Sequence, residues 1–295
     1  MKETDFIEII KNTANSQYIG DDCAYLKDLG IVISQDNLAE DVHFSLKFAT
    51  PYQLGYKSAM VNISDVAASG AEPKYLTVGL SLPVNTDESF IKEFYKGIKD
   101  ANKDVKVIGG DITGSDKVFI SICAIGTTKN RVISSRSNAK VGYKIIVSGE
   151  HGASGAGLKD LFDGNKTDLA LKHLMPKAQV EFSKEIATKI NTDYAMMDTS
   201  DGLADALEKI ANASKVLLSV DFDKIPYDKQ IEKFDDYKDL ILYGGEDYQL
   251  VACVPKNFDV ANSYIIGEVK EGLGVEIDHK PLNTDKYYDH FKEQK

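Results

Sequence analysis

The sequence predicts a two-domain α/β protein. Runs rich in Val, Ile and Tyr alternate with segments of helical periodicity, which is typical of α/β folds. The alternation restarts after a polar stretch at residues 129–140, and the predicted strands and helices carry acidic residues at or near their ends. A chain of 295 residues is long enough for two domains. We therefore expect one domain over residues 1–135 and a second over residues 136–295.

In the first domain, strands are expected where short β-branched and aromatic runs are bounded by polar residues or glycine. These runs are 31–35, 75–82, 105–108 and 118–126. Helices are predicted over 52–69 and 87–102, where apolar residues recur at helical spacing. Thr86 is the expected N-cap of the second helix.

The second domain shows the same alternation. Strands are predicted at 143–148, 216–221 and 248–254, and helices at 154–163, 177–190 and 202–213. Gly152, Gly155 and Gly157 lead into the first of these helices, whose N-terminus could hold an anion. Their spacing is not that of a dinucleotide-binding fingerprint, and the chain has no P-loop motif.

Acidic residues follow several of the apolar runs. These residues are Asp21 and Asp22, Asp36, Asp65, Asp111, Asp198 and Asp201, and Glu246 and Asp247. Carboxylates that are gathered without basic neighbours repel one another unless a cation joins them. Mg²⁺ prefers oxygen ligands and usually takes one or two carboxylates together with substrate phosphates. The pattern therefore indicates several metal ions acting on a polyphosphate.

Each acidic motif taken alone also has a plain structural explanation. Asp65 could lie on a solvated helix face. Asp201 could be the N-cap of the helix that follows it. Gly110 and Asp111 could form a tight turn. Only the number and order of these motifs favour a site over these alternatives.

Composition excludes several classes of protein. The formal net charge of -11 argues against binding to nucleic acid or to an anionic membrane. No apolar stretch approaches the roughly 18 residues of a membrane span, and the first residues do not resemble a signal peptide. Cys23, Cys123 and Cys253 lie far apart, which predicts neither a disulfide framework nor a zinc ribbon and fits the cytoplasm. The five histidines show no zinc-ligand spacing.

Taken together, the motifs closely resemble those of the thiamine-monophosphate kinase family, which shares a superfamily with aminoimidazole ribonucleotide synthetase. The matching segments are Gly-Asp-Asp-Cys-Ala at 20–24, Ser-Gln-Asp at 34–36, Glu-Asp-Val-His-Phe at 40–44, Asn-Ile-Ser-Asp-Val-Ala-Ala-Ser-Gly-Ala-Glu-Pro at 62–73, Gly-Gly-Asp at 109–111, Arg-Ser-Asn-Ala at 136–139, Asp-Thr-Ser-Asp-Gly-Leu at 198–203, Gly-Gly-Glu-Asp-Tyr at 244–248 and Tyr-Asp-His-Phe at 288–291. The resemblance covers nearly the whole chain.

The sequence departs from the family pattern at a few positions. Gln35 stands where a Thr is usual, beside Asp36, and Asp41 stands where a Gly is usual. The run after Arg136 also differs, but Arg136 itself is kept. None of these changes removes an acidic residue of the motifs.

The resemblance implies a reaction, a fold and a set of residues. The reaction is direct in-line transfer of a phosphoryl group from ATP to thiamine monophosphate, assisted by several Mg²⁺ ions. The implied fold is a homodimer in which the first domains form a barrel-like core. The implied Mg²⁺ ligands are Asp21, Asp22, Ser34, Asp36, Asp65, Asp111, Asp198 and Asp201. The implied ATP contacts are Tyr95, Gly110, Asp111, Arg136 and Ser200, and the implied substrate contacts are His43, Glu246 and Tyr288. No residue is expected to act as general base, because the acceptor phosphate is itself the nucleophile.

Two alternatives stay open at this point. The first is a sister enzyme of the same superfamily, namely aminoimidazole ribonucleotide synthetase, selenophosphate synthetase or the hydrogenase-maturation dehydratase. The second is a non-catalytic protein that binds a metal ion or a nucleotide.

Overall fold

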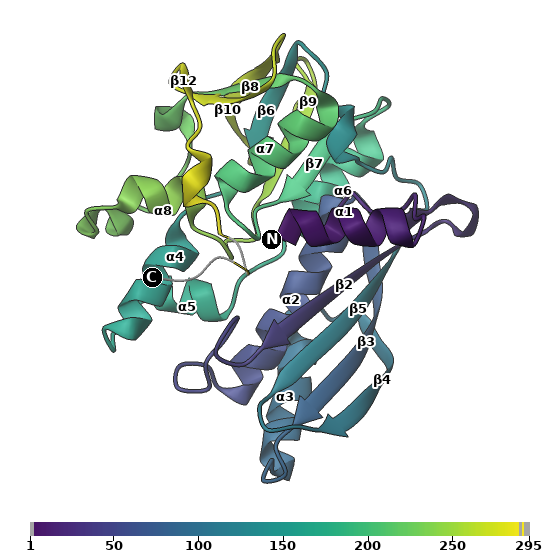
Figure 1. The fold of residues 1–295 in the computed structure, drawn as a ribbon, viewed down its shortest axis with the longest axis vertical. Helices are drawn as coiled ribbons and strands as arrows, with labels where there is room; N and C mark the ends of the chain where they lie inside the picture. Colours follow the sequence, from purple (N-terminus) through teal and green to yellow (C-terminus); the bar gives the residue numbers. More distant parts are fainter. Residues whose placement is uncertain (1–2, 289–290, 292–295) are drawn as a thin grey trace.

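The computed structural model describes residues 3–288 and 291 and has two α/β domains, each built on a mixed sheet (Figure 1). The strand order of the first sheet is β1-β2-β5-β3-β4, and that of the second is β12-β11-β8-β10-β6-β9-β7. The predicted α/β class is therefore confirmed. Neither sheet closes into a barrel within the described residues. None of their helices is long and apolar enough to cross a membrane.

The first domain is a five-stranded sheet with helices on one face. Its strands are β1 (Ala24–Leu26), β2 (Ile31–Ala39), β3 (Glu72–Leu82), β4 (Lys106–Gly114) and β5 (Phe119–Thr127). The helices α2 (Pro51–Ala68) and α3 (Glu88–Ala101) bury the alternate apolar residues of the sheet, such as Leu76, Val78 and Ile122. The other face is open, and β4 forms an edge of the sheet.

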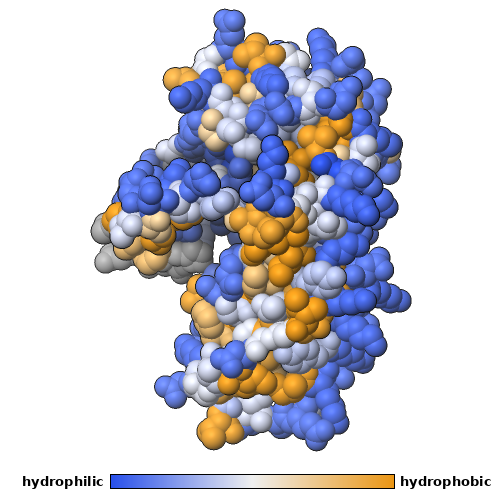
Figure 2. All heavy atoms as spheres, turned by 90° about the vertical axis from the view of Figure 1, so that its right-hand side faces the viewer, coloured by the Kyte–Doolittle hydropathy of each residue, from blue (hydrophilic) through white to orange (hydrophobic). Residues whose placement is uncertain are grey.

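Apolar side chains remain exposed on this sheet. Figure 2 shows hydrophobic residues gathered over the lower half of the molecule, on the side that carries β4. Tyr75, Val107, Ile108, Ile112 and Phe119 are each more than a third exposed. An apolar patch of this kind on an edge strand marks an interaction surface.

The second domain is a seven-stranded sheet covered on both faces. Its strands are β6 (Tyr143–Val147), β7 (Ala195–Asp198), β8 (Leu217–Val220), β9 (Leu250–Pro255), β10 (Tyr264–Lys270), β11 (Gly274–Ile277) and β12 (Lys280–Pro281). Its helices are α4 (Ala153–Phe162), α5 (Asp168–Leu174), α6 (Val180–Lys189), α7 (Leu203–Ser214) and α8 (Tyr237–Tyr243). One buried cluster on this sheet includes Ala67 and Ala68 of α2 with Ile146, Ile186 and Tyr194 of the second domain. The two domains thus share a core.

Several elements differ from the prediction. The sequence did not predict α1 (Glu3–Thr13), α5 or α8, nor the strands β1 and β10 to β12. Helices of seven residues, such as α5 and α8, span only two turns, so they show little periodicity. Thr86 is not the N-cap of α3: the Asp87 side chain accepts a hydrogen bond from the Phe90 amide at 2.8 Å.

Helices α2 and α3 cross with their backbones in contact. A Cβ atom at Gly97 would lie 2.0 Å from the Tyr52 carbonyl oxygen, and one at Gly55 would lie 1.9 Å from the Phe94 carbonyl oxygen. Backbone atoms cannot move aside as a flexible side chain can. The two glycines therefore allow the close packing that places α2 against the sheet.

Replacing Gly97 by Ala is expected to destabilise the protein by about 3 kcal/mol, because the added methyl group overpacks the helix crossing. Urea unfolding measures this change. Gly114→Ala is the control, because nothing lies within 4 Å of the added Cβ atom at the end of β4. Equal stability of the two variants would contradict the packing argument.

Candidate metal centre and adjoining pocket

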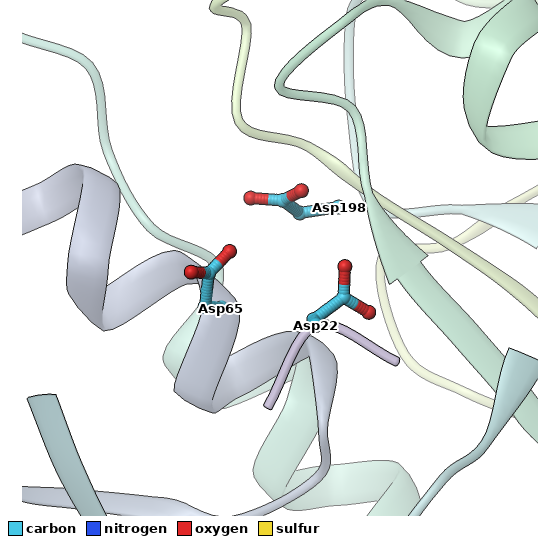
Figure 3. A group of neighbouring side chains, drawn as sticks. All are labelled: Asp22, Asp65 and Asp198. Atoms are coloured by element: carbon cyan, nitrogen blue, oxygen red, sulfur yellow. The ribbon is translucent and has the colours of Figure 1, made fainter. Parts of the chain in front are cut away.

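Three carboxylates meet where the two domains join. Asp22, Asp65 and Asp198 each offer an oxygen atom, and these atoms lie within 4.8 Å of one another. Figure 3 shows the three side chains converging from the loop before β1, from α2 and from the end of β7. The cluster therefore draws on both domains.

Hydroxyl groups orient two of these carboxylates. The Ser34 hydroxyl of β2 donates a hydrogen bond to the Asp65 carboxylate. The Ser64 hydroxyl of α2 donates to Asp198 at 2.6 Å, across the domain boundary. Asp65 therefore faces other acidic groups, and its assignment to a solvated helix face is wrong.

Burial and mutual repulsion make the cluster hard to ionise. Burial is the largest cause that raises the pKa of Asp65 well above its usual range, followed by the charges of Asp36 and Asp198. Burial likewise raises the pKa of Asp198 to about 7 and that of Asp36 to about 6. Asp22 shifts in the same direction, although Arg136 opposes the shift. Without a cation, the cluster retains protons near neutral pH.

Basic groups flank the cluster, contrary to the expectation that the carboxylates lack basic neighbours. Arg136 contacts Asp22 at 2.7 Å, and its backbone amide donates to Asp21 at 2.7 Å. Lys209 of α7 lies 3.1 Å from the Asp201 carboxylate and 2.7 Å from that of Asp205. Arg136 is remote in sequence from the acids that it contacts, whereas Lys209 and Asp205 are four residues apart on α7.

The arrangement fits a hard divalent cation. The donors are carboxylate and hydroxyl oxygens, which Mg²⁺ prefers over nitrogen or sulfur. The Asp198 Oδ1 atom is buried and has no hydrogen-bond partner among the residues that the structure describes. An unsatisfied buried carboxylate oxygen is costly, and a bound cation would satisfy it.

A cavity of about 410 Å³ adjoins the carboxylates. It brings together several residues that the resemblance assigns to metal, ATP or substrate: Asp36, Asp65, Ser200, Asp201, His43, Glu246 and Tyr288. The Nδ1 atom of His43 accepts a hydrogen bond from the Ala39 amide at 3.1 Å, which orients the ring. The cavity is thus lined both by acidic residues of the proposed metal site and by the three proposed substrate contacts, His43, Glu246 and Tyr288.

The sequence missed two residues that contact Glu246. Lys57 of α2 lies 3.0 Å from one carboxylate oxygen, and His173 of α5 lies 3.5 Å from the other. A lone lysine in the apolar run of α2 was the available signal for Lys57. No sequence pattern distinguishes His173 from the other histidines.

The N-terminus of α4 is already occupied by an internal anion. The Asp247 carboxylate accepts hydrogen bonds from the amides of Gly152 at 2.6 Å and Ser154 at 2.8 Å. The expected anion site therefore holds a side chain of the protein.

Asp201 does not cap α7, since Gly202 is the N-cap and makes no side-chain hydrogen bond.

Three predicted site residues lie apart from both the cavity and the acidic cluster in a single chain. Asp111 is exposed on β4, three strands away from β2 and on the face opposite to Asp36. Gly110 precedes it on the same edge strand. Tyr95 of α3 packs edge-on against Phe94, with 5.6 Å between the two ring centroids. One chain therefore does not bring these residues to the carboxylates.

The chain matches known proteins over most of its length. Residues 20–128 match the N-terminal domain, and residues 140–280 the C-terminal domain, of AIR synthase related proteins. The thiamine-monophosphate kinase of Aquifex aeolicus is 35% identical over 98% of both chains. That of Bacillus subtilis is 35% identical over 80% of this chain and 77% of its own.

The chain belongs to the thiamine-monophosphate kinase family. It is accordingly an enzyme of the kinase class.

Solved structures of the family agree with the fold. AaThiL complexed with AMPPCP and TMP has a TM-score of 0.91 and 34% identity, covering 98% of this chain and 97% of the other. The thiamine monophosphate kinase of Aquifex aeolicus has a TM-score of 0.87, with coverage of 95% and 97%. The HypE-HypF complex is 19% identical at a TM-score of 0.76, which shows a shared fold alone.

Proposed function

We propose that this enzyme transfers a phosphoryl group from ATP to thiamine monophosphate, giving ADP and thiamine diphosphate. The observation that carries the proposal is the cavity beside the acidic cluster, which shares Asp65 with that cluster and is also lined by His43, Glu246 and Tyr288. A related structure at 34% identity holds AMPPCP and TMP. Its ligands are an ATP analogue and the proposed acceptor.

The chemistry needs no general base. A phosphate monoester has a second pKa of about 6, so the acceptor is mostly dianionic at neutral pH. An acceptor oxygen forms the new bond to the γ-phosphorus, the bond to the β-phosphate oxygen breaks, and ADP leaves with that electron pair. The obstacle is repulsion between two anions, so catalysis depends on positioning and charge.

Different side chains are proposed to hold the metal ions and to contact ATP. The residues proposed to hold Mg²⁺ are Asp21, Asp22, Ser34, Asp36, Asp65, Asp111, Asp198 and Asp201. When bound, Mg²⁺ supplies the positive charge that offsets repulsion between the phosphates. Arg136 and Ser200 would contact ATP, and the buried Nε atom of Arg136 has no partner within the described residues. Arg136 is held in place by Asp22.

A second copy of the chain would complete the site. We propose that the exposed apolar face and the β4 edge pack against a twofold-related copy, so that the two first domains enclose a barrel-like core. In that arrangement β4 of one copy borders β2 of the other. Gly110, Asp111 and Tyr95 would then approach the carboxylates of the second copy. This accounts for their distance from the cluster in a single chain.

Mixed dimers test this arrangement. Asp65→Asn and Asp111→Asn are each expected to be inactive as pure proteins. When the two are co-expressed, random assortment makes about half of the dimers mixed, and each mixed dimer has one of its two sites with both aspartates intact. About a quarter of wild-type activity should therefore return. No recovery in verified mixed dimers would place Asp111 in the site of its own chain. A monomer in sedimentation at micromolar concentration would contradict the dimer.

The reaction itself is tested by ADP release with ATP, Mg²⁺ and thiamine monophosphate, with the product identified by mass. Thiamine diphosphate should form with Mg²⁺ and not with EDTA. Binding of ATP without this product would instead favour the reaction of a sister enzyme or a non-catalytic binding role.

We also infer a domain boundary at 135/136, in the segment between β5 and β6.

The three cysteines are free thiols, which supports a cytoplasmic location.

A further inference from the structure

Lys57 is a buried lysine in the middle of α2. Its side chain is only 4% exposed, and its Nζ atom lies 3.0 Å from the Glu246 Oε1 atom. Burying an ammonium group is costly unless an anion accompanies it. Neighbours such as Leu54, Ala59 and Met60 are apolar and buried. The position of Lys57 is therefore explained by its pairing with Glu246.

Glu246 is fixed by its backbone and by both carboxylate oxygens. Its φ angle is +66°, and its amide donates to the Ser200 carbonyl oxygen at 2.7 Å. Its Oε2 atom lies 3.5 Å from the Nδ1 atom of His173, which also contacts the Ser154 hydroxyl at 2.9 Å. Burial would raise the pKa of Glu246, but Lys57 and His173 outweigh it and the pKa is lowered. The carboxylate is thus ionised and held in one orientation.

Lys57 contacts Glu246 from outside the proposed substrate cavity. Glu246 lines both the 410 Å³ cavity and a second cavity of about 370 Å³, whereas Lys57 lines only the second. The substrate would meet Glu246 in the first cavity. Lys57 therefore acts through Glu246 and would not touch the substrate.

The ion pair also crosses the domain boundary. Lys57 belongs to α2 of the first domain, while Glu246 and His173 belong to the second domain. The position of the Glu246 carboxylate is consequently tied to both halves of the enzyme, beside the metal centre that both halves also form.

We propose that Lys57 is a positioning residue, which holds the Glu246 carboxylate across the domain boundary so that the cationic thiazolium part of the acceptor meets a fixed anion. This inference rests on the proposed function. Without Lys57, the Glu246 carboxylate would lose its counter-ion and become free to turn away or to bind a proton.

The test is Lys57→Met, an uncharged side chain of similar length. The KM for thiamine monophosphate is expected to rise about tenfold or more, while the KM for ATP changes by less than about twofold. In a Glu246→Gln background, Lys57→Met should cause no further rise, because the two residues act as one unit. Lys57→Arg, which keeps the charge, should recover part of the lost affinity.

Lys144→Met is the matched control. Lys144 is also buried, on β6, and pairs with Asp259, whose side chain is almost fully exposed, away from the cavity. It should leave both KM values unchanged. A general effect of losing a buried lysine would instead move both KM values in the two variants alike.

The outcomes separate the two proposals. If the wild type makes no thiamine diphosphate, the proposed function fails, and the role of Lys57 fails with it. If the wild type is active but Lys57→Met has an unchanged KM for thiamine monophosphate, only the positioning role is overturned. Additive effects of Lys57→Met and Glu246→Gln would also overturn it.

Discussion

Asp65→Asn is expected to lower kcat by about 1,000-fold or more while leaving the fold intact. Asp65 lies in the acidic cluster, where it accepts a hydrogen bond from the Ser34 hydroxyl and faces Asp22 and Asp198. Asparagine has the same shape but lacks the charge that holds a divalent cation. Steady-state kinetics with saturating Mg²⁺ measures the loss, and far-UV circular dichroism checks the fold.

The same variant should be at least as stable as the wild type when metal is absent. Burial and the neighbouring carboxylates disfavour the ionised form of Asp65, so removing its charge relieves repulsion. Urea unfolding in EDTA measures this difference. Asp193→Asn, at an exposed position outside the cluster, is the control and should change neither activity nor stability. Wild-type turnover in Asp65→Asn would disprove the metal assignment.

The stability of the metal-free enzyme should fall as the pH rises from about 4 to about 7. In the unfolded chain, aspartates ionise near pH 3.9, whereas in the folded protein the pKa of Asp36 is about 6 and that of Asp198 about 7. Between these values the folded state binds more protons than the unfolded state. The free energy of unfolding therefore decreases with pH in this range.

Mg²⁺ should suppress most of this pH dependence, because it takes the place of the bound protons. Urea unfolding at pH 5 and pH 8, with EDTA or with Mg²⁺, tests the effect. A residual slope is expected from Asp247, whose pKa burial raises to about 7 and whose carboxylate contacts the N-terminus of α4, outside the metal cluster. Stability that rises with pH in EDTA would contradict the argument.

Local patterns predicted the elements that are long and strongly periodic. The helix α2 and the strands β3 and β5 follow from apolar residues at regular spacing. Strands β2 and β4 continue past their predicted ends at residues 35 and 108, so Asp36 and Asp111 lie within strands and not after them. Elements such as α5 and β12 are too short to carry a pattern of their own. They are defined by the surfaces on which they pack, which a local reading of the chain does not contain.

The same distinction applies to the site. Asp65 carried a signal because Asp is a poor residue inside a helix, and Asp198 because helix capping does not explain an acid at the end of its strand. The contact between Arg136 and Asp22 carried none, since the two residues are 114 positions apart in the sequence. The link between Lys57 and Glu246 likewise exists only once two domains have packed. In the proposed dimer, Asp111 would require one step more, a second chain.

The acidic cluster has a mechanical consequence. Because Asp22 and Asp65 come from one domain and Asp198 from the other, a cation bound among them joins the two halves of the molecule. Any movement that parts the domains must then release the cation, and every contact that holds them together raises the affinity for it. If the proposed site binds Mg²⁺, the strength of the contact between the domains would therefore increase with the concentration of free magnesium.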